Sequence, residues 1–296
     1  MPGYENVRLI NTILNLYYEE KLTQTEIAQR LDLSTPKVNR LLQQARELGY
    51  VSFVIRTPFQ HLFDLEARLK AVFGLQEAIV IPAVGSSSSS LLNAIGTVAA
   101  DFLLEKIRDG DIVAITPGTT VQAVVESLDA TRPYQIEIAP MLGAIQGKFE
   151  SDMNYLATNM GERLGAKAYQ LHAPAYVDTA ENAELMRSMT PVKKILDIAR
   201  HANIALLGVG TVDPEASRFV QFTALSAEDL NYIANGHGGV GEIAARVYDI
   251  EGHPCAMEYA DRVIGLTLDE ILEIPYRIGV AASAPKALPI FGALRG

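Results

Sequence analysis

The sequence predicts an α/β protein in two parts, a small N-terminal helical domain and a larger domain built on a largely parallel sheet. Residues 1–60 carry apolar positions at helical spacing, interrupted by one tight turn. Beyond them, short apolar segments alternate with helical ones, the pattern of parallel strands covered on both faces. The chain has 296 residues, 49% hydrophobic and 20% charged, a composition ordinary for a soluble globular protein.

Several protein classes are excluded by what the sequence lacks. No apolar run reaches the roughly 18 residues of a membrane span. The start, MPGYENVRLIN, has no basic stretch followed by an apolar one, so we expect a cytoplasmic protein. Cys255 is the single cysteine, which rules out an internal disulfide and a cysteine-cluster zinc site. Without an HxH or HExxH pattern, we expect no metal and no cofactor.

Charge is distributed unevenly along the chain. The net charge is −10 at pH 7, but residues 1–56 carry +1 and the remainder −11. The segment 21–46 holds five basic and two acidic residues. If the protein meets a nucleic acid, this charge pattern predicts that the N-terminal domain makes the contact.

The N-terminal apolar spacing predicts three helices. Residues 7–20 form an amphipathic helix and residues 25–31 a second, shorter one. A third helix follows Ser34, a favourable N-cap, and stops at Gly49. Its predicted buried stripe consists of Val38, Leu41, Leu42, Ala45 and Leu48.

A short helix, a tight turn at 32–34 and a capped longer helix together predict a helix-turn-helix, with the third helix as the DNA reader. A strand over 51–55 would follow it as a wing. The residues off the apolar stripe are hydrogen-bonding and include no acid, which suits phosphates and base edges: Thr35, Lys37, Asn39, Arg40, Gln43 and Gln44. Backbone contacts outnumber base contacts, so Lys37 and Arg40 are predicted to contact phosphates. A helical bundle that binds only protein would show a similar polar face.

The run LTQTEIAQRLDLSTPKVNRLLQQARELGYVSFVI, residues 22–55, resembles the N-terminal domain of the SorC family of sugar-responsive bacterial transcription regulators. The resemblance implies a winged helix-turn-helix domain over residues 1–57 and operator DNA as a partner. The predicted DNA contacts are Gln24, Ser34, Thr35, Lys37, Asn39, Arg40 and Gln43.

A linker helix is predicted over residues 58–76, where leucines and valine recur at helical spacing. Such a helix either mediates self-association or packs on its own domain. A buried strand is predicted at 78–82, and the serine run 86–90 is interpreted as a flexible surface loop.

Residues 77–296 are predicted to form a Rossmann-like α/β domain. Further strands are predicted at 112–115, 135–142, 166–174, 204–210, 262–267 and 277–282. Helical stretches between them include 91–105, 121–128, 153–164 and 192–201. Ligands in such folds bind at the carboxyl ends of the strands, where loops meet helix N-termini.

Three loops occupy that position in the predicted sheet. Residues 116–120, Thr-Pro-Gly-Thr-Thr, offer backbone N–H groups and hydroxyls to an anion. Residues 143–148 add the cation of Lys148, and residues 283–286 add Lys286. Each loop is a weak signal by itself, but three at equivalent ends of one sheet predict a binding site, with two lysines in an acidic domain.

The glycine-rich run 236–242 does not fit a dinucleotide fingerprint, because no GxGxxG opens a helix after the first strand. Glu242 at its end either points into a cleft, where it accepts hydrogen bonds from sugar hydroxyls, or lies solvated near a helix start.

The SorC resemblance extends over nearly the whole chain, through Gly118-Thr119-Thr120, GGVGEIAARVYDIEGHP and the C-terminal RVIGLTLDEILEIPYRIGVAASAPKALPIFGALRG. It implies an effector domain similar to sugar-phosphate isomerases and deaminases that senses a phosphorylated sugar. Gly118, Thr119, Thr120 and Lys286 would hold phosphate, with Lys148 a further candidate, and Glu242 would bind sugar hydroxyls.

Two departures from the family pattern fall in this implied site. Pro117 stands where the family has an aromatic residue before the glycine, and Ala282-Ser283 replaces a glycine pair ahead of the lysine. These departures leave an unphosphorylated or smaller polyol as an alternative effector.

The predicted function is sequence-specific DNA binding that regulates a carbohydrate or polyol catabolic operon under control of a phosphorylated sugar. The resemblance also implies a homotetramer, a dimer of dimers. The alternative is a sugar-phosphate isomerase or deaminase with an appended DNA-binding domain. That chemistry needs a positioned base beside a second acid or a histidine, and the five histidines show no catalytic spacing. We therefore predict that the protein is not an enzyme.

Overall fold

The computed structural model describes residues 4–51, 57–83, 87–144, 152–217 and 225–296. The chain divides into two compact units, residues 1–61 and residues 62–296, which are described separately below. This division falls inside the predicted linker segment 58–76. None of the helices in the described ranges combines the length and the apolar character that a bilayer crossing requires.

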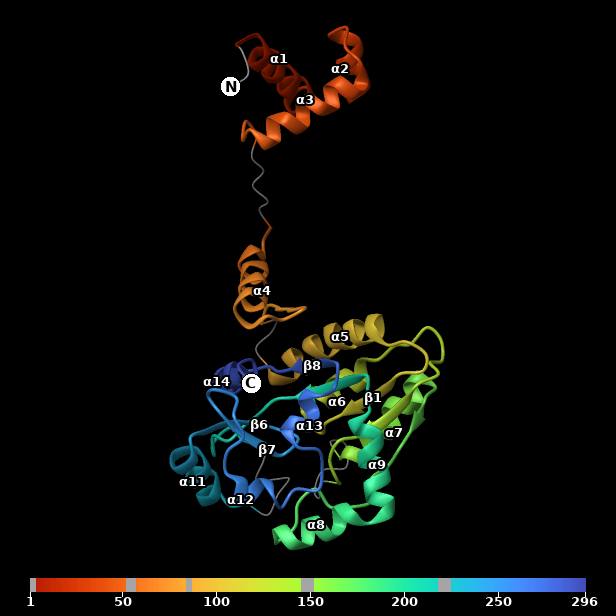
Figure 1. Ribbon diagram of the computed structural model, residues 1–296, viewed down its shortest axis with the longest axis vertical. Helices are drawn as coiled ribbons and strands as arrows, with labels where there is room; N and C mark the ends of the chain where they lie inside the picture. The colour runs from red at the N-terminus through yellow and green to blue at the C-terminus, as the bar shows by residue number, and fades with distance from the viewer. Residues whose placement is uncertain (1–3, 52–56, 84–86, 145–151, 218–224) are drawn as a thin grey trace. The chain divides into compact units, whose positions relative to one another are not determined.

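The N-terminal unit is a small helical bundle (Figure 1). Its core gathers ten buried apolar residues from all its helices, among them Ile10, Ile27 and Leu42. A reciprocal capping box begins the second helix, because Thr23 and Glu26 each accept a hydrogen bond from the other's backbone N–H. The elements are α1 (Tyr4–Leu14), the π-helical turn η1 (Asn15–Glu19), α2 (Gln24–Arg30) and α3 (Thr35–Glu47).

The predicted helix-turn-helix is confirmed, with three local corrections. The first helix does not run unbroken to residue 20, since η1 replaces its last turn. Ser34 occupies the N-cap position of α3, but its side chain makes no capping hydrogen bond. Leu48 is 43% exposed and lies outside the buried stripe, because α3 ends at Glu47. The predicted wing strand at 51–55 falls on residues 52–56, which lie outside the described residues.

The larger unit is built on a five-stranded parallel sheet with strand order β3-β2-β1-β4-β8. The order reverses direction between β1 and β4, as in doubly wound folds. Its strands are β1 (Ile112–Ile115), β2 (Glu137–Pro140), β3 (Lys167–Ala168), β4 (Ile204–Gly208) and β8 (Tyr276–Val280). The predicted α/β class with a largely parallel sheet is therefore confirmed.

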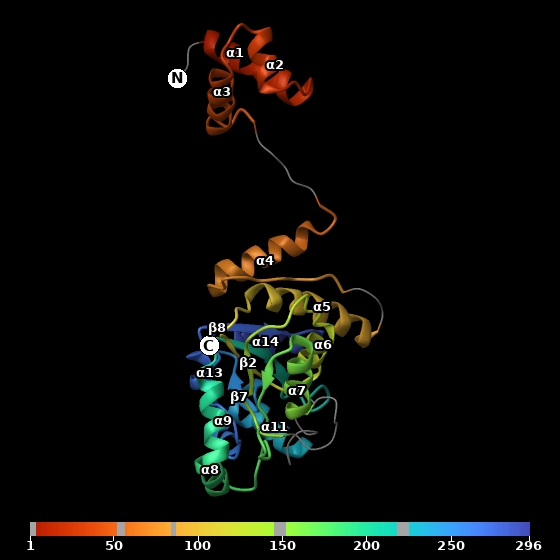
Figure 2. The same cartoon turned by 90° about the vertical axis from the view of Figure 1, so that its right-hand side faces the viewer.

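Helices cover both faces of this sheet because both faces are apolar. Val113 and Ile115 of β1 face one core with α5, α6 and α7, whereas Ala114 faces a second core with α8, α9 and α13. Figure 2 shows α7 and α9 on opposite sides of the sheet. The helices are α5 (Ser88–Lys106), α6 (Thr119–Ser127), α7 (Met153–Leu164), α8 (Ala180–Ser188), α9 (Thr190–Arg200) and α13 (Leu268–Leu272).

An antiparallel ribbon of three strands, order β5-β6-β7, follows the parallel strand β4. The sequence analysis did not predict it. Arg246, 5% exposed, ties the ribbon to the main body by donating to the carbonyl oxygens of Ala260, Gly265 and Leu266. The elements here are β5 (Gly210–Thr211), α11 (Ala227–His237), β6 (Gly239–Ile243), β7 (Arg246–Asp249) and α12 (Met257–Ala260).

Two predicted strands are wrong. Residues 78–82 form no strand, and Ile79 is 51% exposed. Residues 262–267 make only isolated bridges, such as that between Gly265 and Leu142. The remaining elements are α4 (Gln60–Phe73), the short 3-10 turn η3 (Ala284–Lys286) and α14 (Ala287–Ala293).

The packing of α5 against α6 predicts an intolerant glycine. A Cβ at Gly96 would overlap the backbone carbonyl of Ala123, whereas a Cβ at Gly279 would meet open space. Gly96→Ala should lower the free energy of unfolding by about 2 kcal/mol, because overpacking forces the two helices apart. Gly279→Ala is the matched control and should stay near the wild type. Equal urea midpoints for all three proteins would contradict this account of the helix pair.

Candidate functional site

The third helix of the N-terminal unit presents a polar, cationic surface. Its inner side buries Val38, Leu41, Leu42 and Ala45. The outer side leaves most of the predicted DNA contacts exposed, as Ser34, Lys37, Asn39, Arg40 and Gln43, with Thr35 partly buried at the first turn. The one apolar stripe thus turns these donors and acceptors outward together. Their contact with DNA stays a prediction.

Two of these predicted contacts have further features in the structure. Gln24, partly buried, is the first residue of α2 and therefore does not lie on α3. Gln43 donates a hydrogen bond of 3.0 Å to Glu47. To contact a base, Gln43 must give up its hydrogen bond to the exposed Glu47.

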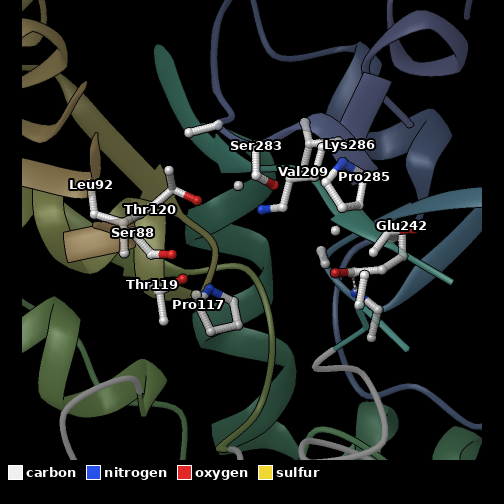
Figure 3. A pocket seen from close by; sticks show the side chains of 18 of the residues that line it. Ser88, Leu92, Pro117, Thr119, Thr120, Val209, Glu242, Ser283, Pro285 and Lys286 are labelled. Carbon is white, nitrogen blue, oxygen red and sulfur yellow. Dashed lines mark hydrogen bonds between the residues drawn. The ribbon is translucent and has the colours of Figure 1, made fainter. Parts of the chain in front are cut away.

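The larger unit contains a pocket of about 450 Å³ at the carboxyl ends of β1, β4 and β8. It opens at the point where the strand order reverses, the usual ligand position in doubly wound sheets. Figure 3 shows side chains from the loop after β1, the ribbon and the segment after β8 around the same space. Gly118, Thr119, Thr120, Glu242 and Lys286, which are separated widely in the sequence, all line it.

The loop after β1 brings a helix N-terminus to the pocket. Gly118 is the N-cap of α6 and has φ 125°, a backbone conformation that favours glycine. Thr119 and Thr120 form the first turn, where backbone N–H groups have no partner within the helix. Thr120 is 3% exposed, so its hydroxyl is held in place by packing. This loop can offer N–H and O–H donors to an anion.

The ribbon places a carboxylate opposite that helix. Glu242 of β6 pairs with Gly210 of β5, and a Cβ at Gly210 would overlap the Glu242 carboxylate. Its Oε2 accepts a hydrogen bond of 3.0 Å from the Ala245 N–H (Figure 3, dashed line). The structure thus corrects the alternative of a solvated residue at a helix start: Glu242 lies on a strand, partly buried in the pocket.

Burial dominates the electrostatics of this carboxylate. Loss of hydration raises the pKa of Glu242, while the Ala245 N–H and the charge of Lys286 act in the opposite direction. The turn that supplies the N–H is itself unusual. Ala244 and Ala245 have φ 52° and 62°, values at which a two-residue hairpin normally carries asparagine and glycine.

The segment after β8 supplies the cation and a second backbone outlier. Lys286 ends the turn η3 and lines the pocket. Ser283 begins that turn with φ 101° and ψ 149°, a region that non-glycine residues occupy at a cost of about 1–3 kcal/mol. The turn closes through a 3.2 Å hydrogen bond from the Lys286 N–H to the Ser283 carbonyl.

The sequence analysis missed several lining residues. Ser88 of the serine run lines the pocket from the start of α5, and Ser87 caps that helix by accepting from the Ser90 N–H. The interpretation of this run as a flexible loop is therefore wrong for residues 88–90, which are helical. The signal that could have predicted this is a serine placed directly before an apolar helical run, a typical N-cap. Gly208 to Thr211 also line the pocket, although 204–210 was predicted as one strand. Lys148 lies outside the described residues.

Among the described residues, no group of three or more histidine, cysteine, aspartate or glutamate side chains is arranged to hold a metal ion. A helix-turn-helix unit, together with an α/β unit that has a pocket at its sheet switch point, is the architecture of a ligand-responsive DNA-binding regulator.

Comparisons with known proteins place this class more closely. The sequence model of the family described as "Putative sugar-binding domain" matches residues 57–296, and that of sigma-70 region 4 matches residues 11–47. A deoxyribonucleoside regulator of Bacillus subtilis is 31% identical, covering 95% of this chain and 89% of its own length. A sorbitol operon regulator of Klebsiella pneumoniae is 29% identical over 100% of this chain and 94% of its own.

The fold agrees with these matches. The crystal structure of the full-length sorbitol operon regulator SorC from Klebsiella pneumoniae has a TM-score of 0.74 and 28% identity, covering 99% of this chain and 94% of that one. The chain belongs to the SorC family of sugar-binding transcriptional regulators.

The raised pKa of Glu242 predicts a pH-dependent stability. An acid whose pKa rises on folding from its ordinary value of 4.5 destabilises the folded state once the pH exceeds that value. Glu242→Gln should therefore be more stable than the wild type at neutral pH. The difference should vanish as the pH falls through the window between the raised and the ordinary pKa.

Glu26→Gln is the control of opposite sign. Hydrogen bonds from the Thr23 N–H and hydroxyl lower the pKa of exposed Glu26, so its ionised form stabilises the fold and the substitution should lose stability at neutral pH. Urea unfolding between about pH 4 and about pH 8 measures both variants. A Glu242→Gln protein no more stable than the wild type at neutral pH would show that burial does not dominate there.

Proposed function

We propose that the protein regulates a carbohydrate or polyol catabolic operon by binding operator DNA through α3 and a phosphorylated sugar or polyol in the pocket of the larger unit. The observation that carries this proposal is the convergence of Thr119, Thr120 and Lys286 with Glu242 around one cavity. The named relatives regulate deoxyribonucleoside and sorbitol genes, which supports a carbohydrate effector.

Several groups around the pocket suit a phosphate. Lys286 supplies a positive charge, and the first turn of α6 supplies N–H groups and the Thr119 and Thr120 hydroxyls. Charge-assisted hydrogen bonds of this kind are about twice as strong as neutral ones. A dianion also suits the helix N-terminus, where the dipole is positive.

The surroundings of Glu242 suit a hydroxylated carbon chain. The Glu242 carboxylate accepts hydrogen bonds, and two or more sugar hydroxyls could share its oxygens. Around it the lining is small and apolar, through Leu142, Ala175 and Ala245. Such a wall favours the carbon skeleton of a sugar or polyol, and 450 Å³ lies within the range of small-molecule sites, about 300–1,000 Å³.

We infer that the pocket binds its ligand without turning it over. Among the described residues that line it, Glu242 and Lys286 are the only titratable side chains, and no histidine is present. Isomerase or deaminase chemistry needs a base working with a second acid or with a ring-opening histidine. The described lining therefore lacks the second acid or histidine that a sugar-phosphate isomerase needs. Glu242 and Lys286 are the residues to replace in a test for such activity.

We further propose a homotetramer, assembled as a dimer of dimers in the cytoplasm. Operator binding by helix-turn-helix pairs requires two copies, on half-sites about 34 Å apart or at multiples of that spacing. Helix α4, within the segment 58–76 that we assign to the linker, buries none of its residues in the single chain. Its Phe63, Leu65 and Val72 are exposed, which supports self-association through this helix.

Control of the operon requires that the ligand distinguish two arrangements of the protein. A change of about 100-fold in operator affinity corresponds to about 2.7 kcal/mol of differential ligand binding. One or two charge-assisted hydrogen bonds to the phosphate would supply this difference in binding free energy, since each contributes about 1.5–3 kcal/mol.

Arg40→Ala should weaken operator binding about tenfold, because it removes an exposed cation from the DNA-facing side of α3. An operator selected from random duplexes and labelled for fluorescence anisotropy gives the measurement. The slope of log K against log[salt] should also fall by about 0.9. Arg8→Ala, which removes an exposed arginine from α1, is the matched control. Equal losses in both variants would mean that α3 is not the reader.

Lys286→Ala should abolish the response to effector while leaving operator affinity intact. A thermal-shift screen of sugar phosphates and free polyols identifies the ligand, since saturation at about 100 times Kd adds about 2.7 kcal/mol of stability. That shift should disappear in Lys286→Ala and persist in Lys194→Ala, which removes an exposed lysine of α9. Loss of operator binding in the Lys286 variant would contradict the division of labour between the two units.

A further inference from the structure

At the rim of the pocket, a serine occupies a backbone conformation that favours glycine. Ser283 has φ 101° and ψ 149°, it is exposed, and it lines the cavity. Glycine would adopt the same angles without strain. The side chain of Ser283 therefore lowers the stability of the fold relative to glycine at this position.

The side chain of Ser283 lies among the groups that suit a phosphate. Figure 3 shows it pointing into the cavity, which Thr120 and Lys286 also line. Ser283 and Lys286 begin and end one turn, closed by the 3.2 Å hydrogen bond between the Lys286 N–H and the Ser283 carbonyl. Hydroxyl and ammonium are thus carried by a single short segment that faces one ligand.

Strained non-glycine residues concentrate at ligand clamps, where a contact made in the complex offsets the strain. We propose that the Ser283 hydroxyl donates a hydrogen bond to the anionic group of the effector beside Lys286, and so selects a phosphorylated ligand over the unphosphorylated one. This inference rests on the proposed function. A phosphate dianion offers only acceptors, and the serine hydroxyl has one proton to donate.

Two variants of Ser283 separate the hydroxyl from the strain. Ser283→Ala removes the hydroxyl and keeps a Cβ at the strained angles, whereas Ser283→Gly removes both. The full chain is titrated with inorganic phosphate by calorimetry, in chloride buffer. Both variants should bind phosphate about tenfold more weakly than the wild type, as expected for one lost hydrogen bond to a charged group. Ser283→Gly alone should also raise the unfolding temperature.

Ala256→Gly is the matched control for relief of strain. Ala256 has φ 52° at the start of α12 and does not line the pocket. Its replacement relieves the positive φ angle but removes a buried methyl group, and it should leave phosphate affinity unchanged. If Ser283→Gly weakens phosphate binding and Ala256→Gly does not, the effect belongs to the side chain of Ser283 and not to a general change of stability.

The outcomes distinguish this inference from the proposed function. If phosphate binding is lost in Lys286→Ala but equals the wild type in both Ser283 variants, the hydroxyl makes no contact and the inference is overturned, while the phosphate site stands. If the wild-type protein does not bind phosphate and is stabilised only by free polyols, the phosphate site and the role of Ser283 both fall.

Discussion

The pocket depends on one constraint, the reversal of strand order between β1 and β4. Because the connections from these neighbouring strands run over opposite faces of the sheet, the segments that leave their carboxyl ends diverge and leave a space between them. The buried Thr116 hydroxyl joins the two ends by accepting a 2.8 Å hydrogen bond from the Gly208 N–H. The loop that leads into α6 follows Thr116 directly, and the ribbon that carries Glu242 follows Gly208. Both halves of the candidate site are thus positioned from this one junction.

The ribbon shows how glycine in the sequence becomes space for other side chains. A Cβ at Gly210 would overlap the Glu242 carboxylate, and a Cβ at Gly241 would overlap the buried Tyr248 hydroxyl. That hydroxyl donates a 3.0 Å hydrogen bond to the carbonyl of Pro289 in α14, the helix that follows Lys286. Tyr248 of β7 therefore links the ribbon that carries Glu242 to α14, the helix that follows Lys286. The positions of Glu242 and Lys286 in the pocket are therefore set by backbone packing.

Local sequence signals predicted the elements whose stability is local. The α3 stripe carries its own helical periodicity, and the loop ending in Thr120 carries the glycine at which α6 begins. The glycine-rich strand β6 has low intrinsic β propensity, and it forms because Val247 and Tyr248 of the neighbouring strand fill the space its glycines leave. Conversely, residues 78–82 are mostly apolar but form no strand, so an apolar run alone did not specify one. What the sequence could not supply was the tertiary partner in each case.

The binding pocket concentrates features that lower the stability of the empty protein. Glu242 is a partly buried carboxylate, Ala244 and Ala245 hold positive φ angles, and Ser283 holds another. Elsewhere in the larger unit the local preferences and the fold mostly agree, as consistent sequences require, and conflicts of this kind are expected where function imposes them. A ligand whose hydroxyls hydrogen-bond Glu242 and whose anion meets Lys286 would offset part of this cost only when bound. The difference in stability between the empty and the ligand-bound protein is then larger than the ligand contacts alone would give. A metabolite needs such a difference in free energy to shift an equilibrium between two states.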